Sequence, residues 1–220
     1  MKLRVNSGSL RGRLPEAKSN EEDCMHVSSR KAAWGGSVFA VLLVSAYAEP
    51  VTYQVDPNHT HPSFAADHMG GLSVWRGKFN KASGTIVMDK VAKTGTVEIT
   101  IDAGSIDFGN DELNEHARGP DMFDVAKYPT AVYKGILADF EDGKPGKVVG
   151  TLTLHGVTKP LTLEIDEFLC KPHPASKKEV CGADASAEFN RSDYGISYGA
   201  AYGFKQEVEL QIQVEAIRKD

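Results

Sequence analysis

The sequence is poor in several features that mark common protein classes. Lysine and arginine number 25 against 30 aspartate and glutamate residues, and no basic stripe follows the chain. This balance argues against nucleic acid or an anionic membrane surface as the partner. Cysteine occurs three times and never in a Cys-x-x-Cys pair, the spacing that lowers the pKa of a redox-active thiol.

The sequence patterns of familiar enzymes are also missing. There is no Gly-x-Ser-x-Gly, no Ser-x-x-Lys, no papain-like cysteine setting and no glycine-rich phosphate loop. Asp102, Asp107 and Asp111 form a spaced acidic set, but they lack the glycine and the twelfth-position glutamate of a calcium loop. We interpret them as turn and cap residues and predict no catalytic residue.

No apolar run reaches the roughly twenty residues that a helix needs to span a bilayer. The run Ala32–Ser45 follows Arg30-Lys31 and precedes the small residues Ala46-Tyr47-Ala48. This order is typical of a cleaved secretory signal peptide, which we assign to residues 25–48. We therefore expect an exported protein without a membrane anchor after cleavage.

Residues 1–24 are polar and show no apolar periodicity. Met25 would begin a signal peptide of ordinary length, so we interpret residues 1–24 as a leader upstream of the true start; a long n-region is the alternative. The remaining chain, residues 49–220, is long enough for one domain. It holds 18 lysines and arginines against 26 acids, a net charge of −8.

The predicted mature chain keeps two cysteines, Cys170 and Cys181, on either side of a polar loop with Pro172 and Pro174. In an oxidising compartment such a lone pair predicts a disulfide, worth about 3 kcal/mol by the loop-entropy estimate. A redox-active pair is the alternative.

Most of the mature chain alternates apolar and polar residues, the period of strands with one buried face. The clearest example is Thr151–Ile165, where two alternating runs flank a polar connection at residues 155–159. Further strands are expected at residues 52–55, 63–68, 74–88, 96–101, 130–140, 147–154, 160–168, 185–191 and 208–216. About eight antiparallel strands with one dry face each must close on themselves or pair face to face.

One helix is expected among these strands. Asn110 is its predicted cap, Asp111 and Glu112 fall in the first turn, Arg118 in the last, and Gly119-Pro120 ends it. We interpret this helix as a short lid-like insert.

A series of motifs in fixed order resembles the YceI-like family of bacterial periplasmic proteins. The motifs are Tyr53-Gln-Val-Asp56, His61-Pro-Ser-Phe64, Gly77-Lys-Phe79, Gly84-Thr-Ile-Val-Met-Asp89, His116-Ala-Arg118, Asp121-Met-Phe-Asp-Val-Ala-Lys-Tyr-Pro129, Leu154-His-Gly-Val-Thr-Lys-Pro-Leu-Thr-Leu163 and Phe189-Asn-Arg-Ser-Asp-Tyr-Gly-Ile196. The resemblance implies an all-β protein, an extended antiparallel lipocalin-like barrel of about eight strands with one short helical insert. It also implies a periplasmic protein without a known reaction that encloses a polyisoprenoid tail, as of an isoprenyl pyrophosphate or quinone.

The predicted binding residues follow from this barrel. The expected lumen set is apolar and inward-facing: Phe64, Phe79, Val97, Ile99, Ile101, Leu152, Leu154, Leu161, Leu163, Phe189, Leu210 and Ile212. Since an imidazole or guanidinium near the barrel mouth suits a pyrophosphate or carbonyl head group, His116, Arg118 and Arg191 are the candidate contacts. Loop-anchoring arginines, and side chains that fill a solid core, are the alternatives.

His59-Thr-His61, with His68 and His116, offers pairs of ligands but no metal-site spacing, so no metal and no cofactor are predicted. We predict a binding or carrier protein for a long-chain isoprenoid lipid, not an enzyme and not a nucleic-acid binder. Two rivals stay open: a quinone- or metal-dependent redox accessory, and a stress-response barrel without a ligand. The sequence leaves homodimerisation and any delivery partner undetermined.

Overall fold

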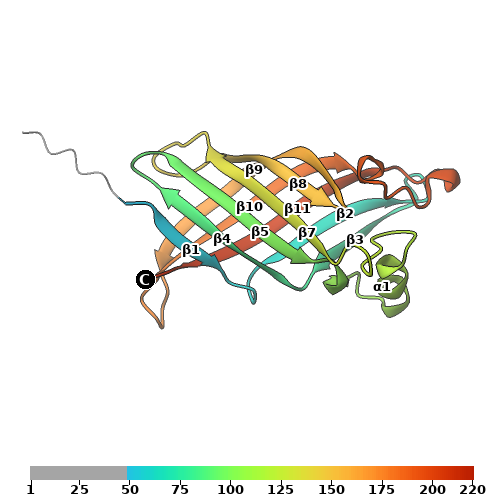
Figure 1. Ribbon diagram of the computed structural model, residues 1–220, viewed down its shortest axis with the longest axis horizontal. Coiled ribbons are helices and arrows are strands. Elements are labelled where there is room, and N and C mark those ends of the chain that lie inside the picture. Colours follow the sequence, from blue (N-terminus) through green and yellow to red (C-terminus); the bar gives the residue numbers. More distant parts are fainter. Residues whose placement is uncertain (1–48) are drawn as a thin grey trace, which may run out of the picture. The chain divides into compact units, whose positions relative to one another are not determined.

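The structure is a computed structural model that describes residues 49–220. The predicted signal peptide and the upstream leader lie outside the described residues. The described part is one antiparallel sheet that closes into a barrel, with helical segments gathered at one end (Figure 1).

Eleven strands and one α-helix make up this part of the chain. Their bounds are β1 Val51–Val55, β2 His61–His68, β3 Ser73–Phe79, β4 Ala82–Asp89, β5 Thr94–Asp102, β6 Ile106–Asp107, α1 Asp111–Arg118, β7 Thr130–Ala138, β8 Lys147–Leu154, β9 Val157–Pro172, β10 Glu179–Asn190 and β11 Glu207–Arg218. Three short 3₁₀ turns, η1 Ala103–Ser105, η2 Arg191–Tyr194 and η3 Ala200–Tyr202, complete it.

The barrel closes through β11, which pairs with β10 along one edge and with two strands in turn along the other. Residues 208–213 of β11 pair with β2, and residues 216–218 pair with β1. The closed ring is therefore β1-β4-β5-β7-β8-β9-β10-β11, while β2, β3 and β6 extend the sheet beside it. This arrangement confirms the antiparallel barrel of about eight strands with one short helical insert.

The step from β1 to β2 is fixed by Thr60, a fully buried residue. Its hydroxyl donates to the carbonyl of Glu215 at 3.2 Å and accepts from the amide of Glu215 at 3.1 Å. Because this side chain satisfies both backbone groups of one β11 residue, β11 can change partner there without an unpaired polar group.

Two expected features differ in detail. The run 74–88 is not one strand, because Asn80-Lys81 separates β3 from β4, which pair with different neighbours. The connection of the signature hairpin is only His155-Gly156, both with positive φ (50° and 76°), instead of residues 155–159. Such a two-residue turn matches the twist of the paired strands, so pairing continues to the turn itself.

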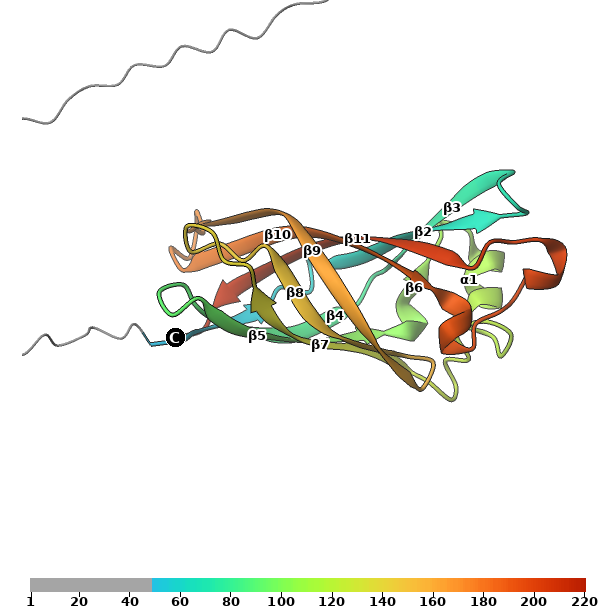
Figure 2. The same ribbon diagram turned by 90° about the horizontal axis from the view of Figure 1, so that it is seen from above.

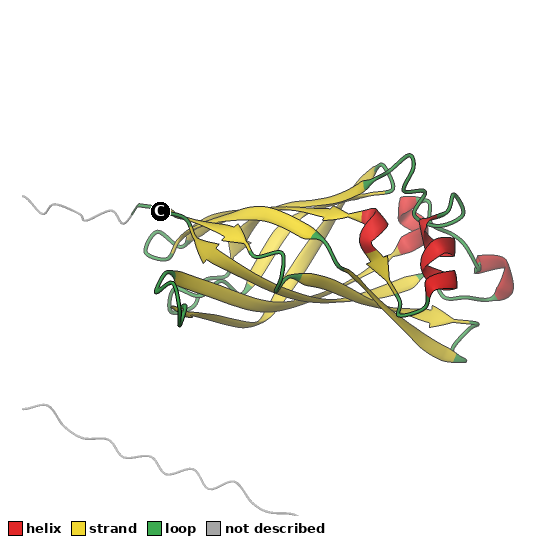
Figure 3. Cartoon of the chain, turned by 90° about the horizontal axis from the view of Figure 1, so that it is seen from below, coloured by secondary structure: helices red, strands yellow, loops and turns green. Residues whose placement is uncertain are grey.

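The helix has the predicted bounds. Asn110 accepts a hydrogen bond from the amide of Leu113 at 2.9 Å, and Asp111 and Glu112 occupy the first turn. All helical segments lie at the end of the barrel opposite the C-terminus (Figure 3). We call this the helix end, and the other the terminal end.

Candidate functional site

The barrel encloses a cavity of about 400 Å³. Its lining comes from every strand of the closed ring and from α1, and most of it is aliphatic or aromatic. The structure brings all twelve residues of the predicted lumen set into this lining. The barrel is therefore not solid at its centre, and whether these residues bind a ligand stays a prediction.

Period-two alternation explains why the lining is so apolar. On β8 and β9 the inward residues Leu152, Leu154, Leu161 and Leu163 are each at most 8% exposed, while Thr162 between them is exposed. Since the other strands of the ring also turn apolar residues toward the cavity, hydrocarbon placed there would gain roughly 25 cal/mol per Å².

A buried tyrosine in the cavity wall has its polar atom satisfied by the backbone. The hydroxyl of Tyr133 lies 2.9 Å from the carbonyl oxygen of Leu161 and 3.0 Å from that of Val148, and burial raises its pKa. Gly150 makes room for it, because a Cβ there would approach the Tyr133 hydroxyl to 2.8 Å and the Lys134 carbonyl to 2.4 Å. The ring thus presents carbon to the lumen.

A polar cluster lies at the terminal end of the cavity. The ring of Tyr53 lines the cavity, and its hydroxyl donates to Glu179 at 3.1 Å. The other oxygen of Glu179 accepts from Lys90 at 2.6 Å, and Arg218 lies 4.0 Å away. Burial, with the negative charge of Glu179, raises the pKa of Tyr53 to about 12, while the hydrogen bond from Lys90 holds the pKa of Glu179 below its ordinary value.

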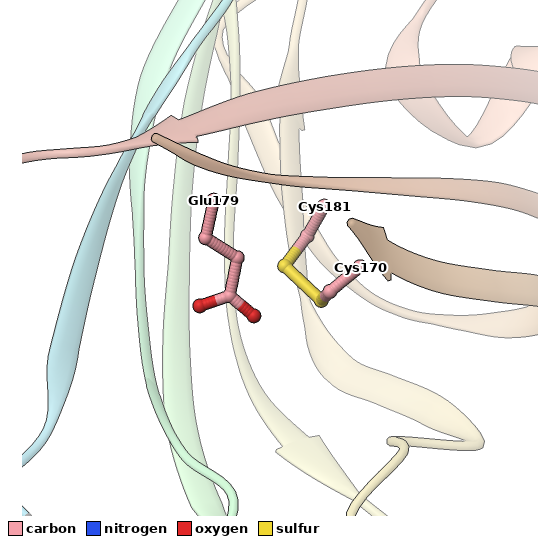
Figure 4. A group of neighbouring side chains, drawn as sticks. All are labelled: Cys170, Glu179 and Cys181. Atoms are coloured by element: carbon pink, nitrogen blue, oxygen red, sulfur yellow. A yellow bond between two sulfur atoms is a disulfide. The ribbon is translucent and has the colours of Figure 1, made fainter. Parts of the chain in front are cut away.

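The predicted disulfide is present beside this cluster (Figure 4). Cys170 and Cys181 face each other across the β9–β10 pair, with a Cα–Cα distance of 4.0 Å, and Cys181 lines the cavity. Glu179 lies near both sulfur atoms, the one group of three close ligand atoms in the described part of the chain. The sulfurs bond each other and the carboxylate binds Lys90, so we interpret the group as a structural closure.

The helix end holds two of the three predicted head-group residues. His116 and Arg191 both line the cavity and meet at Tyr198: the His116 ring lies 4.7 Å from the Tyr198 ring, and Arg191 donates to the Tyr198 carbonyl at 2.7 Å. Arg191 also donates to the Ile196 carbonyl at 3.2 Å, and burial lowers its pKa. The Nε2 atom of His116 is buried without a hydrogen-bond partner.

Arg118, the third, is not among the residues that line the cavity. Positions two apart on a helix point about 200° apart around its axis, so Arg118 faces away from His116. Its Nε donates to the carbonyl of Gly104 at 3.0 Å, and Glu115 lies 3.4 Å from its Nη1. Arg118 therefore holds η1 against α1.

Several lining residues were not in the predicted set. An aromatic group at the helix end comprises His68, Trp75, Phe108 and Phe204, with ring centroids 5.2 Å apart for His68 and Phe204 and 6.3 Å for Trp75 and Phe108. Phe108 and Phe204 come from loops, where there is no strand alternation to extend, and His68 is the last residue of β2. Trp75 shares a strand face with Gly77 and Phe79, and that parity could have identified it.

The histidines occupy separate places. His59 lies in an exposed turn, 2.8 Å from Asp56, and His61 begins β2. His155 occupies the β8–β9 turn, where its Nδ1 donates to the Tyr194 carbonyl at 3.0 Å. Within residues 49–220 the histidines do not join a group of three ligand atoms.

A family model described as "YceI-like domain" matches residues 53–216. The chain belongs to the YceI-like family. It is 32% identical over 188 residues to Protein YceI of Escherichia coli O6:H1, a match that covers 84% of this chain and 96% of that protein. The family resemblance drawn from the motifs is thereby confirmed.

Solved structures agree with the YceI-like fold. The YCEI protein of Campylobacter jejuni is 27% identical with a TM-score of 0.56, covering 68% of this chain and 88% of that one. A polyisoprenoid binding domain from Saccharophagus degradans is 17% identical with a TM-score of 0.54, covering 76% and 98%. In residues 49–220, no helix combines the length and the apolar character that crossing a membrane requires.

Proposed function

We propose that this protein binds and carries a long isoprenoid lipid, with the hydrocarbon tail in the barrel cavity. The cavity itself carries the proposal, because it is about 400 Å³ in volume and lined almost throughout by hydrocarbon side chains. A solved domain of the same fold is described as binding polyisoprenoid, which adds support.

The two ends of the cavity give the tail a direction. At the terminal end Tyr53 and Lys90 both donate to Glu179, so these three side chains are engaged within the fold. At the helix end the Nε2 atom of His116 is buried without a partner, and Arg191 donates to the carbonyl of Tyr198, whose ring contacts His116. We place the tail toward the terminal end and a pyrophosphate or carbonyl head group near His116 and Arg191.

The proposed role is sequestration or transport in the periplasm, without chemical change to the lipid. Export rests on the apolar run and the Ala46-Tyr47-Ala48 pattern, and cleavage is expected before Glu49. N-terminal sequencing of the exported protein tests this step. A mature chain that begins at Met25 or Ala32 would remove the periplasmic assignment.

A charge placed in the cavity tests the binding site. Leu163→Glu puts a carboxylate into a dry wall, at a cost of several kcal/mol, and we expect loss of the lipid or of the fold. Thr162→Glu is the matched control, because Thr162 is the adjacent β9 residue and faces solvent. The measurement is native mass spectrometry of protein purified from its own host, followed by lipid extraction.

The expected result is an isoprenoid mass carried by the wild type and by Thr162→Glu but not by Leu163→Glu. A folded Leu163→Glu protein with the same lipid at the same affinity would place the tail elsewhere. Recovery of a chemically altered isoprenoid after incubation with purified protein would favour an enzyme instead.

A further inference from the structure

Exposed apolar side chains are concentrated at the helix end. Of the nine large hydrophobic residues that are exposed in residues 49–220, five lie in two segments, the β2–β3 hairpin and the β10–β11 connection. These five are Met69, Leu72, Val74, Tyr198 and Tyr202. Leu72 and Tyr202 are 72% and 75% exposed, which is unusual for side chains that gain free energy on burial.

The two segments form one surface. Asp67 accepts hydrogen bonds from the amide of Lys205 at 2.9 Å and from that of Gly70 at 2.8 Å, and these bonds lower its pKa. Gly70 and Gly203 also approach closely, since a Cβ at Gly70 would lie 3.1 Å from the Gly203 carbonyl oxygen. Both segments lie at the α1 end in Figures 1 and 2.

This surface has a charge unlike the rest of the chain. Apart from Asp67, which joins the two segments, and Asp193, which precedes the second, the surface carries no acid: residues 68–78 and 194–206 contain no aspartate or glutamate, although acids outnumber bases in residues 49–220. Their exposed charges are Arg76, Lys78 and Lys205, none of which forms an ion pair in the part of the chain that the structure describes. An apolar tip with a few free bases is complementary to the interface of an anionic bilayer.

The surface is continuous with the cavity. The same segments turn Trp75, Phe204 and Tyr198 toward the lumen, and Tyr198 lines the cavity while being 39% exposed. At the terminal end the lining residues Tyr53, Met88 and Ala216 are at most 2% exposed. The cavity therefore meets solvent beside the exposed apolar tips.

We propose that the β2–β3 hairpin and the β10–β11 connection dock the protein on a phospholipid bilayer, with Leu72 and Tyr202 entering the interface. This inference rests on the proposed lipid carriage. An isoprenoid that passes from bilayer to cavity through water would expose its whole tail, and docking at the open end removes that exposure. The acidic balance of the whole chain, which argues against an anionic membrane partner, does not extend to these two segments, although Asp67 joins them and α1 at the same end carries Asp111, Glu112 and Glu115.

The test is flotation of the purified mature protein with vesicles of phosphatidylethanolamine and phosphatidylglycerol. Replacing both Leu72 and Tyr202 by serine should lower the partition coefficient by about tenfold or more, since two apolar contacts are lost. The control is Ile136→Ser with Val149→Ser, an exposed apolar pair that lies cross-strand on the outer wall of β7 and β8. This control should partition like the wild type.

A second assay separates docking from carriage. Binding of detergent-solubilised geranylgeranyl diphosphate should be equal in the wild type and the Leu72, Tyr202 variant, because the cavity is unchanged. If the wild type binds this lipid but not vesicles, docking is wrong and carriage stands. If it floats with vesicles and binds no isoprenoid, docking stands and the proposed function fails.

Two further outcomes overturn the inference. Equal loss of flotation in the outer-wall control would show that any exposed apolar pair suffices. A Leu72, Tyr202 variant that floats normally but changes the molecular mass in solution would assign the surface to a second copy of the chain.

Discussion

The two ends of the barrel bound the same apolar lumen in opposite ways. At the terminal end a disulfide, a tyrosine hydroxyl and an ion pair with Lys90 join β1, β9, β10 and the end of β4. At the helix end short turns, edge-on aromatic contacts and hydrogen bonds to the Tyr198 carbonyl and the Asp67 carboxylate hold the rim. The walls between them are built by one alternating pattern.

This difference indicates that one end of the barrel contributes mainly to stability and the other mainly to ligand access. Covalent and charged contacts that are satisfied within the fold make the terminal end costly to open. The helix end keeps an unpartnered buried imidazole atom and exposed apolar tips, which favour contact with something outside the chain. We expect substitutions at the terminal end to act on stability and those at the helix end to act on binding.

The largest effect is expected from the disulfide. Replacing both Cys170 and Cys181 by alanine frees a loop whose closure is worth about 3 kcal/mol, so the free energy of unfolding in urea should fall by about that amount. Reductant should lower the stability of the wild type in the same way and leave the double variant unchanged. If thiol labelling shows that the bond is fully reduced and the free energy of unfolding of the wild type is unchanged, the stability of the terminal end does not depend on this disulfide.

The next effect is expected from Glu179, and it depends on pH. Glu179→Gln should cost about 1–2 kcal/mol at neutral pH, because Lys90 and Tyr53 lose a charged acceptor. The hydrogen bond from Lys90 lowers the pKa of Glu179, so its contribution is present above the ordinary glutamate pKa and is lost as the pH falls through the lowered value.

Chemical unfolding of the wild type and Glu179→Gln between pH 7 and pH 2.5 measures this contribution. Their stabilities should converge at the acid end of the range. Glu188→Gln, an exposed position further along β10, is the control and should stay parallel to the wild type. A constant difference between the wild type and Glu179→Gln across the range would contradict the ionic closure.

Much of the fold could be predicted from the sequence, because each long strand carries its own alternation. β8 and β11 have an unbroken apolar face, and Asn110 with two following acids marks the helix start. β9 alternates cleanly from Leu161 to Ile165, but its register with β10 shifts at Asp166, which the alternation does not predict. The division of residues 74–88 at Asn80-Lys81 was not predicted, because β3 pairs with β2 while β4 pairs with β1 and β5, and partner choice is a property of the closed sheet. β6 has only two residues and no period to detect.

The cavity wall could be predicted as a list of residues but not as a cavity. The same inward leucines and valines would fill a solid core, and only the closed ring determines how much space they leave. The terminal closure was missed because Tyr53, Lys90 and Glu179 are far apart in sequence and meet only when β1 joins β4 and β11. His116 and Arg118 are two residues apart, yet helix geometry sends them to different neighbours.

A smaller effect is expected from His116 at the helix end. His116→Phe keeps the ring against Tyr198 and removes the buried Nε2 atom, which has no partner, so stability should not fall. If this nitrogen meets the head group, affinity for geranylgeranyl diphosphate should fall about fivefold to tenfold, while affinity for geranylgeraniol stays unchanged. Calorimetry with both ligands measures the ratio, and equal losses for the two would assign His116 to the tail.

The smallest effect is expected from Asp67, and it isolates the helix end from the rest of the barrel. The Asp67 carboxylate accepts hydrogen bonds from the amides of both Gly70 and Lys205. Asp67→Asn removes its charge, so the β2–β3 hairpin and the β10–β11 connection should loosen together. Amide hydrogen exchange should become faster in these two segments, with no change in β9, β10 or the melting temperature. Because the two segments share a single carboxylate oxygen, faster exchange in only one of them would show that they do not form one surface.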